Sequence, residues 1–153
     1  CRSFFERYQG FLDALSANGL TPALASFAGP DAFANAENLA ELIGRTQELP
    51  QAFVCANDFV SIDLIRALKK RRIRVPEDVR IVGFDNSMES RIIEPHLTTV
   101  HIPSPEMGFL AADLLLSRIE RPETPYRIMH VRTAVKYRDS TGSLTPEEEA
   151  DSL

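Results

Sequence analysis

The stretch AFVCANDFVSIDLIRALKKRRIRVPEDVRIVGFD, residues 52–85, decides the fold of this chain. It opens with a continuous apolar run at residues 52–56, which is typical of a strand buried on both faces. A helical pattern follows, and its apolar stripe is formed by Ile62, Ile65 and Leu68. Residues 79–84 then predict a second strand. A strand, a helix and a strand joined by short loops predict parallel pairing with a right-handed crossover.

The residues before this stretch repeat the alternation of helices and strands. Apolar residues recur at helical spacing between residues 4 and 15, and Asn18-Gly19 is a stop signal for that helix. Residues 24–27 are a short strand candidate, and residues 29–31 predict a turn. We expect a second helix, whose apolar face is formed by Phe33, Ala36, Leu39, Ala40 and Ile43.

The residues after the stretch are less regular. Residues 86–96 predict a long connection, and residues 97–102 predict a strand. A helix from about residue 106 to 119 follows, and then a linker at residues 121–125. A last strand with alternating character is expected over about residues 128–138. The whole pattern predicts an α/β domain with a mostly parallel sheet.

Composition restricts the class of protein. The 153 residues suffice for one ordinary domain, and 44% hydrophobic with 25% charged residues is usual for a soluble globular chain. No apolar run approaches the roughly 20 residues that a membrane span needs, so we expect no membrane contact. The net charge of -5 argues against a surface built to bind nucleic-acid phosphates. Cys1 and Cys55 make no disulfide framework, which favours a reducing cytoplasm.

Catalytic and metal-binding patterns are missing from the sequence. The histidines, at positions 96, 101 and 130, lack metal-ligand spacing, and no carboxylate pair is placed for acid–base work. No glycine-rich phosphate loop occurs. Cys55 lies in an apolar run, where a small buried hydrophobe is a better interpretation than a nucleophile. We therefore predict neither an enzyme nor a cofactor.

A basic run lies where the central helix should end. It consists of Arg66, Lys69, Lys70, Arg71, Arg72 and Arg74. Cations at a helix C-terminus are favourable through the helix dipole, and no aromatic residue interleaves these. A solvated helix end is therefore our interpretation, and nucleic-acid contact is the minor alternative.

Four landmarks in order resemble the LacI/GalR family of bacterial transcription regulators. The first is ERYQGF at residues 6–11, and the second is AND at residues 56–58, after a strand. The third is VPEDVRIVGFDN at residues 75–86. The fourth is PHLTTV at residues 95–100, continued by RDST at residues 138–141. All four at compatible spacings identify the chain as similar to the ligand-binding part of that family.

The resemblance implies the two-lobed periplasmic-binding-protein-like fold, in three αβα layers. Residues 1–95 and 126–142 would form the C-terminal lobe, and residues 96–125 would be the crossover strand and helix of the N-terminal lobe. Residues 143–153, rich in polar residues, are expected to be disordered. Nearly all of the N-terminal lobe and the helix-turn-helix would be absent, leaving a helix with exposed apolar surface that invites association.

The resemblance also implies an effector site formed by Arg7, Asn57 and Asp85. Asn57 and Asp85 each follow a predicted strand, and ligands of open α/β sheets bind beyond the carboxyl ends of the strands. Carboxylate, amide and guanidinium groups suit the hydroxyl groups of a sugar. The structural alternatives are an Arg7–Asp85 ion pair and a helix cap at Asn57. We assign Asp58 to capping.

The sequence departs from the family pattern at two places. The family often has an aromatic residue after the second strand, where this chain has Pro30, with Phe27 and Phe33 nearby. The family's small residue at the position of Asp63 is also replaced. The identity of the effector is therefore open.

The predicted function is effector binding and dimerisation in a LacI-family regulator. The effector would be a sugar or nucleoside, the partner a second copy, and DNA would be bound only through a helix-turn-helix absent from this chain. The alternative is the sugar-binding protein of an ABC transporter, which has the same fold. A third hypothesis is that this piece alone has no binding activity, with weak or undetectable sugar affinity, because one wall of the cleft is missing.

Overall fold

A computed structural model describes residues 2–22, 36–45 and 48–142 of the chain. The expected strand at residues 24–27, the turn at residues 29–31 and the tail at residues 143–153 lie outside the described residues. The same holds for the aromatic position discussed at Phe27, Pro30 and Phe33.

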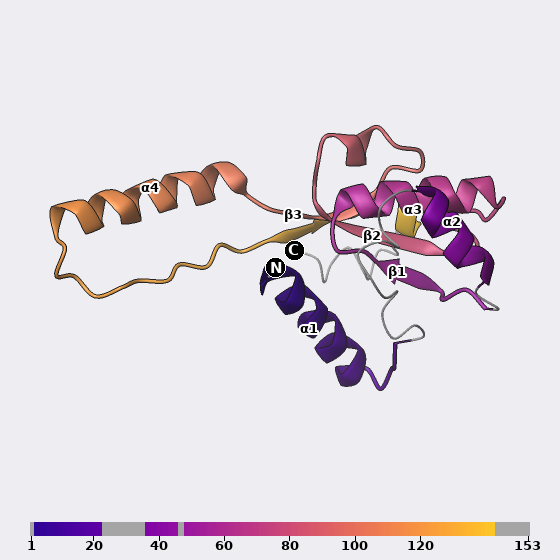
Figure 1. Cartoon of the computed structure of the whole chain (residues 1–153), viewed down its shortest axis with the longest axis horizontal. Helices are drawn as coiled ribbons and strands as arrows, with labels where there is room; N and C mark the ends of the chain where they lie inside the picture. Colours follow the sequence, from indigo (N-terminus) through magenta and orange to yellow (C-terminus); the bar gives the residue numbers. More distant parts are fainter. Residues whose placement is uncertain (1, 23–35, 46–47, 143–153) are drawn as a thin grey trace.

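The described residues form four helices, four strands and two short 3-10 turns (Figure 1). The helices are α1 (Arg2–Ala17), α2 (Ala36–Arg45), α3 (Asp58–Lys70) and α4 (Ser104–Glu120). The strands are β1 (Ala52–Val54), β2 (Arg80–Asp85), β3 (Thr98–His101) and β4 (Ala134–Lys136), and the 3-10 turns are η2 (Glu89–Arg91) and η3 (Asp139–Thr141).

The strands form one mixed, mostly parallel sheet in the order β1-β2-β3-β4. β1 pairs parallel with β2, and β2 parallel with β3, whereas β4 runs antiparallel to β3. The predicted α/β class with a mostly parallel sheet is confirmed. Because the first three strands are parallel, their carboxyl ends lie along one edge of the sheet, where Asp85 pairs in register with His101.

The core lies between the sheet and helices α2 and α3, which pack against each other. Leu68 of α3 is fully buried against Ile81 of β2, as the apolar stripe of that helix predicts. Leu39 and Ile43 of α2 belong to the same cluster. Burying a side chain of this size stabilises the fold by roughly 1.5–3 kcal/mol, so this cluster carries most of the hydrophobic stabilisation.

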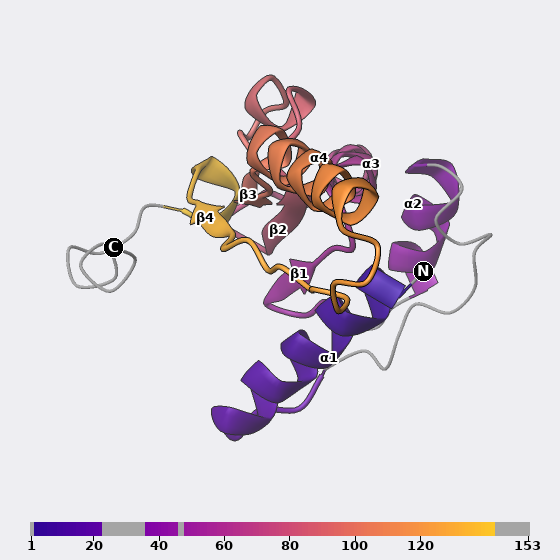
Figure 2. The ribbon, with the colours of Figure 1, turned by 90° about the vertical axis from the view of Figure 1, so that its left-hand side faces the viewer.

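The expectation that β1 is buried on both faces is wrong. Phe53 is buried, but Ala52 is exposed and the Val54 side chain is 55% exposed. On the side of the sheet opposite α3, the described cover is helix α1 (Figures 1 and 2). None of the residues of α1 is buried, so this helix covers that face of β1 only in part. An apolar run therefore marked a strand correctly without indicating what covers it.

Helix α4 forms an arm that projects from the sheet (Figure 1). None of its residues is buried, and Phe109, Leu115 and Ile119 are each more than 60% exposed. The chain returns along residues 121–133, where strand was expected from residue 128. That prediction is corrected, since the strand covers Ala134–Lys136 only, the part that lies beside β3.

Candidate functional site

The three predicted site residues meet near the carboxyl ends of β1 and β2. Asp85 ends β2, and Asn57 follows β1 and precedes α3. Arg7 reaches the same place from α1, more than forty residues away in sequence. The structure thus brings together side chains from three elements, as the strand-end argument predicts.

Arg7 holds the site together through its guanidinium group. Nη1 donates a hydrogen bond of 2.7 Å to the carbonyl oxygen of Ala56, directly before Asn57. Nη2 lies 3.7 Å from Oδ1 of Asp85. The guanidinium carbon also lies 3.7 Å from the ring centroid of Phe84, a cation–π contact. The Arg7–Asp85 ion pair considered above is therefore present, but it is long and partly exposed to solvent.

Asn57 caps helix α3, as the structural alternative proposed. Its Oδ1 accepts a hydrogen bond of 2.9 Å from the backbone N–H of Val60, and its backbone is extended at the N-cap position. The assignment of Asp58 to capping is wrong. Asp58 is the first residue of the helix, and its carboxylate turns inward to Ser87 and Thr99 instead.

Asp85 is the partly exposed carboxylate of the site. Burial raises the pKa of its carboxyl group above the usual value, the charge of Arg7 lowers it, and the charge of Asp58 raises it. Its side chain is 37% exposed. A partly desolvated carboxylate with one distant cation gains from a new donor, so neighbouring hydroxyl groups of a polyol would be suitable ligands.

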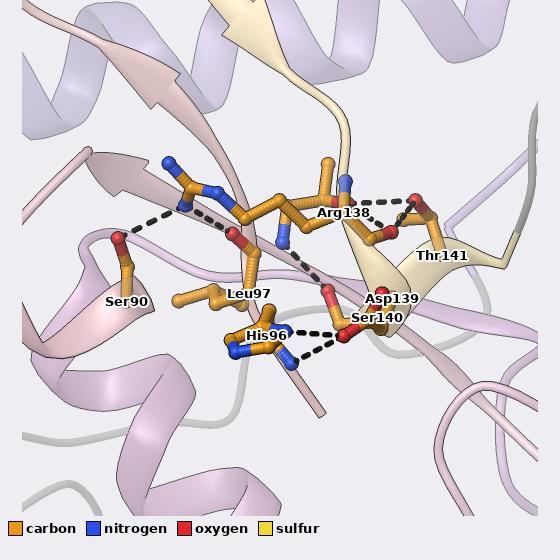
Figure 3. Close-up of polar contacts among 8 residues, drawn as sticks. Ser90, His96, Leu97, Arg138, Asp139, Ser140 and Thr141 are labelled. Carbon is orange, nitrogen blue, oxygen red and sulfur yellow. Dashed lines mark hydrogen bonds and ion pairs between the residues drawn. The ribbon is translucent and has the colours of Figure 1, made fainter. Parts of the chain in front are cut away.

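The turn after β2 is fixed by Arg138, which follows β4. Its Nη2 donates a 2.5 Å hydrogen bond to Oδ1 of Asn86, the residue next to Asp85. Its Nη1 donates to the carbonyl oxygen of Leu97 at 2.7 Å and to Oγ of Ser90 at 3.0 Å (Figure 3). Desolvation lowers the pKa of Arg138, yet three acceptors satisfy the guanidinium, so it serves as a fixed donor between β4 and the site.

The end of the RDST landmark anchors the chain beneath this turn. Oγ of Ser140 donates to the carbonyl oxygen of Ile81 and accepts from the backbone N–H of Thr98 at 2.8 Å. His96 and Asp139 lie beside it, with 2.6 Å between Nδ1 and Oδ2 (Figure 3). Ser140 thus satisfies two buried backbone groups, whereas the contact of Asp139 with His96 is exposed.

Sequence reasoning missed the polar residues that support the site from behind. Asp58, Asn86, Thr99 and Arg138 form this set. Two adjacent threonines in a predicted strand were the available signal, because a hydroxyl group that becomes buried must find a partner. The partners of Thr99 are Asp58 of α3 and the backbone of Asn86 after β2, those of Thr98 lie in residues 138–141, and no local pattern identifies them.

The basic run lies at the C-terminal end of α3 and in the residues that follow. Nη1 of Arg66 pairs with Oδ1 of Asp63 at 3.3 Å, and Nη2 of Arg74 pairs with Oδ1 of Asp78 at 2.6 Å. The residue that replaces the family's small one, Asp63, is thus a partner of that basic run. This end of α3 is far along the helix from Asn57 and the candidate site.

The described residues contain neither a candidate metal cluster nor a helix suited to a membrane. No group of three or more His, Cys, Asp or Glu side chains in that part of the chain is placed to hold a metal ion. None of the described helices combines the length and apolar character needed to cross a membrane.

Comparison with known proteins gives consistent matches. The model of the family called periplasmic binding protein-like domain matches residues 2–141. The HTH-type transcriptional repressor PurR of Aliivibrio salmonicida is 34% identical over 140 residues, which are 91% of this chain and 42% of that protein. The HTH-type transcriptional regulator GalR of Escherichia coli is 33% identical over 122 residues, 78% of this chain and 35% of that protein.

Solved structures agree with these relatives. The transcriptional regulator CelR in complex with cellobiose superposes with a TM-score of 0.78 and 32% identity, over 89% of this chain and 42% of that one. A LacI family regulator from Enterococcus faecium with bound ribose gives 0.75 and 28%, over 93% and 53%. The chain therefore spans less than half the length of the curated relatives it matches. These named relatives are transcription regulators and not enzymes.

Proposed function

The chain belongs to the periplasmic binding protein-like family as it occurs in LacI/GalR regulators, and from this premise we propose that it forms one wall of an effector site. The observation that carries the proposal is the meeting of Arg7, Asn57 and Asp85 at the carboxyl ends of β1 and β2. Arg7 and Asp85 have polar atoms that a ligand can engage, whereas the Oδ1 atom of Asn57 is occupied by the helix cap. Asn57 would contact ligand through its amide nitrogen.

A sugar or nucleoside is the effector class that this chemistry fits. Asp85 would accept hydrogen bonds from two neighbouring hydroxyl groups, and the Arg7 fork would donate to ring or hydroxyl oxygens. Similar structures are described as complexes with cellobiose and with ribose. The Phe84 ring is covered by Arg7, so an aromatic platform for a sugar ring is not offered at that position.

The division into lobes is also a proposal, and pairing of β3 refines it. Residues 1–95 and 126–142 would belong to one lobe, and residues 96–125 to the other. Since β3 (Thr98–His101) is hydrogen-bonded to β2, we place the break after His101 and not at residue 96. The α4 arm would then be the part that enters the second lobe, in keeping with its lack of buried residues.

In the whole protein, effector binding would change the affinity for DNA. The ligand would favour one lobe arrangement, and a helix-turn-helix outside this chain would make the DNA contact. A cytoplasmic regulator without catalytic activity follows from this proposal. The relatives support a regulator better than the sugar-binding protein of an ABC transporter, since PurR and GalR are named as transcription regulators.

Association into a homodimer is part of the proposal. The exposed apolar side chains of α4 favour association of this chain with a second copy. Sedimentation analysis at rising protein concentration should show a dimer or larger species. A clean monomer at the highest concentration would contradict it.

The effector proposal is tested by NMR titration of the labelled chain. Because one wall of the cleft buries little ligand surface, we expect weak binding, with shifts of the amides near Asn57 and Asp85 when ribose or cellobiose is added. Asp85→Ala should abolish these shifts. Asp113→Ala, on the exposed arm, is the matched control and should leave them unchanged.

Two results would overturn the proposal. One is the absence of localised shifts with ribose, cellobiose and a nucleoside at high concentration. The other is a response that persists in Asp85→Ala, which would place the ligand elsewhere. Micromolar affinity of the monomeric chain would contradict the one-walled description of the site.

A further inference from the structure

The turn that carries Asp85 has an unfavourable backbone conformation. Asp85 has φ = 116° and Asn86 has φ = 54°, and neither residue is glycine. Asparagine tolerates the left-handed region better than most residues, but φ = 116° at Asp85 is strained and persists only where neighbouring contacts hold it. Contacts around this turn must therefore supply the missing stabilisation.

Asp58 supplies the central contact from the first turn of α3. The residue is fully buried, and Oδ2 of its carboxylate accepts a 2.7 Å hydrogen bond from the backbone N–H of Ser87. Oδ1 accepts a 2.5 Å hydrogen bond from the hydroxyl group of Thr99. The N-terminal end of the helix favours a negative charge at this position.

Thr99 extends the reach of that carboxylate to the next amide of the turn. Its hydroxyl oxygen accepts a 3.2 Å hydrogen bond from the backbone N–H of Asn86. A carboxylate only accepts hydrogen bonds, so the hydroxyl proton of Thr99 points to Asp58 and the oxygen is left to accept from Asn86. Two successive N–H groups of the turn, those of Asn86 and Ser87, thus end at Asp58, one directly and one through Thr99.

The packing around Asp58 shows a position shaped for a carboxylate. Gly83 of β2 faces it, and a Cβ atom there would overlap Oδ1 of Asp58 and come within 2.9 Å of Cδ2 of Leu97. The buried carboxylate therefore lies tightly behind β2. It has no access to the ligand side of Asp85.

We propose that Asp58 is a positioning residue of the effector site, which holds the Asp85–Asn86 turn in the ligand-binding conformation without touching the ligand. The inference rests on the proposed function for its consequence, but its geometry is independent of any ligand. The charge of Asp58 also acts on the site through space. Burial is the largest cause of the raised pKa of Asp85, the charge of Arg7 lowers that pKa, and the charge of Asp58 raises it further.

The variant Asp58→Asn tests the proposal because it keeps the shape and removes the charge. The amide nitrogen of asparagine can donate but not accept, so either the Thr99 hydroxyl proton turns away or Ser87 N–H loses its acceptor, and in both cases no carboxylate remains to hold the two amides of the turn. The amide protons of Asn86 and Ser87 should exchange with solvent roughly 10-fold faster or more, while those of the rest of β2 keep their rates. Asp63→Asn in the same helix is the matched control, since the Asp63 carboxylate accepts a hydrogen bond from the surface side chain of Arg66.

A second measurement separates positioning from general loosening. Removing the Asp58 charge should lower the pKa of Asp85, measured from its carboxyl carbon shift against pH. Asp63→Asn should leave that pKa unchanged. Unchanged exchange at Asn86 and Ser87 together with an unchanged pKa of Asp85 in Asp58→Asn would overturn the proposal.

Thr99→Val decides the matter if Asp58→Asn does not fold. It removes the relay while keeping the carboxylate, so the Asn86 amide should lose protection and the Ser87 amide should keep it. If the Asn86 amide in Thr99→Val keeps the protection that it has in the unsubstituted chain, the proposal is overturned.

The ligand measurement distinguishes this inference from the proposed function. If ribose or cellobiose shifts the site amides, Asp58→Asn should weaken that binding roughly 10- to 100-fold and Asp63→Asn should not. Full binding by Asp58→Asn would overturn the positioning role. If neither sugar binds the unsubstituted chain, the proposed function fails, and the exchange and pKa measurements still decide the role of Asp58.

Discussion

Helices α3 and α4 each follow a parallel strand of the same sheet, yet α3 buries seven of its residues and α4 buries none. Their apolar content does not explain the difference, since α4 is rich in leucine and also contains phenylalanine, isoleucine and alanine. The path of the chain explains it. α3 packs over β2, whereas α4 leads away from the sheet before the chain returns to β4 (Figure 1).

This comparison shows that an apolar helix face stabilises a fold only where a second surface meets it. The α3 face meets β2, α2 and the fully buried Leu97. The α4 face meets solvent among the described residues, and exposed apolar area of this kind favours association. Substitutions at matched positions of the two helices should therefore have very different effects.

The largest expected difference is between two leucines. Leu68→Ala, in α3, should lower the free energy of unfolding by roughly 2–5 kcal/mol, because it removes a fully buried side chain and leaves a cavity. Leu116→Ala, in α4, should change it by about 0.5 kcal/mol or less, since that side chain is 56% exposed. Urea denaturation followed by circular dichroism measures both. Equal losses would mean that the arm packs in solution.

Replacing two glycines by alanine should change the stability in opposite directions. Gly83→Ala should destabilise the protein by roughly 1–3 kcal/mol, because its Cβ would meet Asp58, Leu97 and Ser61 at once. Gly108→Ala should stabilise it by about 0.5–1 kcal/mol, since no atom lies within 4 Å of the new Cβ and alanine favours the helix. Thermal unfolding of the two variants should move in opposite directions. A loss of stability in Gly108→Ala would show that something covers that face of α4.

Two serines test hydrogen bonds in the same way. Ser140→Ala should cost about 1–2 kcal/mol, because the buried groups of Thr98 and Ile81 lose their partner. Ser117→Ala removes only a hydrogen bond to Arg127 at the surface of the arm, so a change below about 0.5 kcal/mol is expected. Denaturant midpoints compare the pair, and a larger effect at Ser117 would reverse the ranking.

The smallest effect is expected at the solvent-exposed ion pair between Arg74 and Asp78. Hydrogen bonds from Arg74 lower the pKa of Asp78 from 3.8 to about 2. The folded pKa is depressed, so the stabilisation is present above pH 3.8 and is lost as the pH falls through about 2. In Asp78→Asn, stability should depend less steeply on pH across that interval. Because the pair is exposed, the effect should be small, and a large one would contradict solvent screening.

Much of the site could be predicted from the sequence, but not its supporting residues. Asp85 and Asn57 follow apolar runs, and the carboxyl ends of parallel strands meet at one edge, so their proximity is a consequence of local pattern. Arg7 was predicted as a site residue only through the resemblance to the LacI/GalR family. Asp58 was assigned to capping by the rule for residues before a helix, although Asn57 occupies that position and Asp58 points inward.

The sequence by itself determined the alternation of strands and helices, the mostly parallel character of the sheet and the inward face of α3, because apolar periodicity is a local property. Only the tertiary structure decided that β1 is covered on one face, that α4 stands apart, and that Asp58 reaches Ser87 and Thr99. The physical reason is that burial and hydrogen-bond partners depend on which surface lies opposite. That surface comes from residues distant in sequence, such as Arg138 beside Asn86.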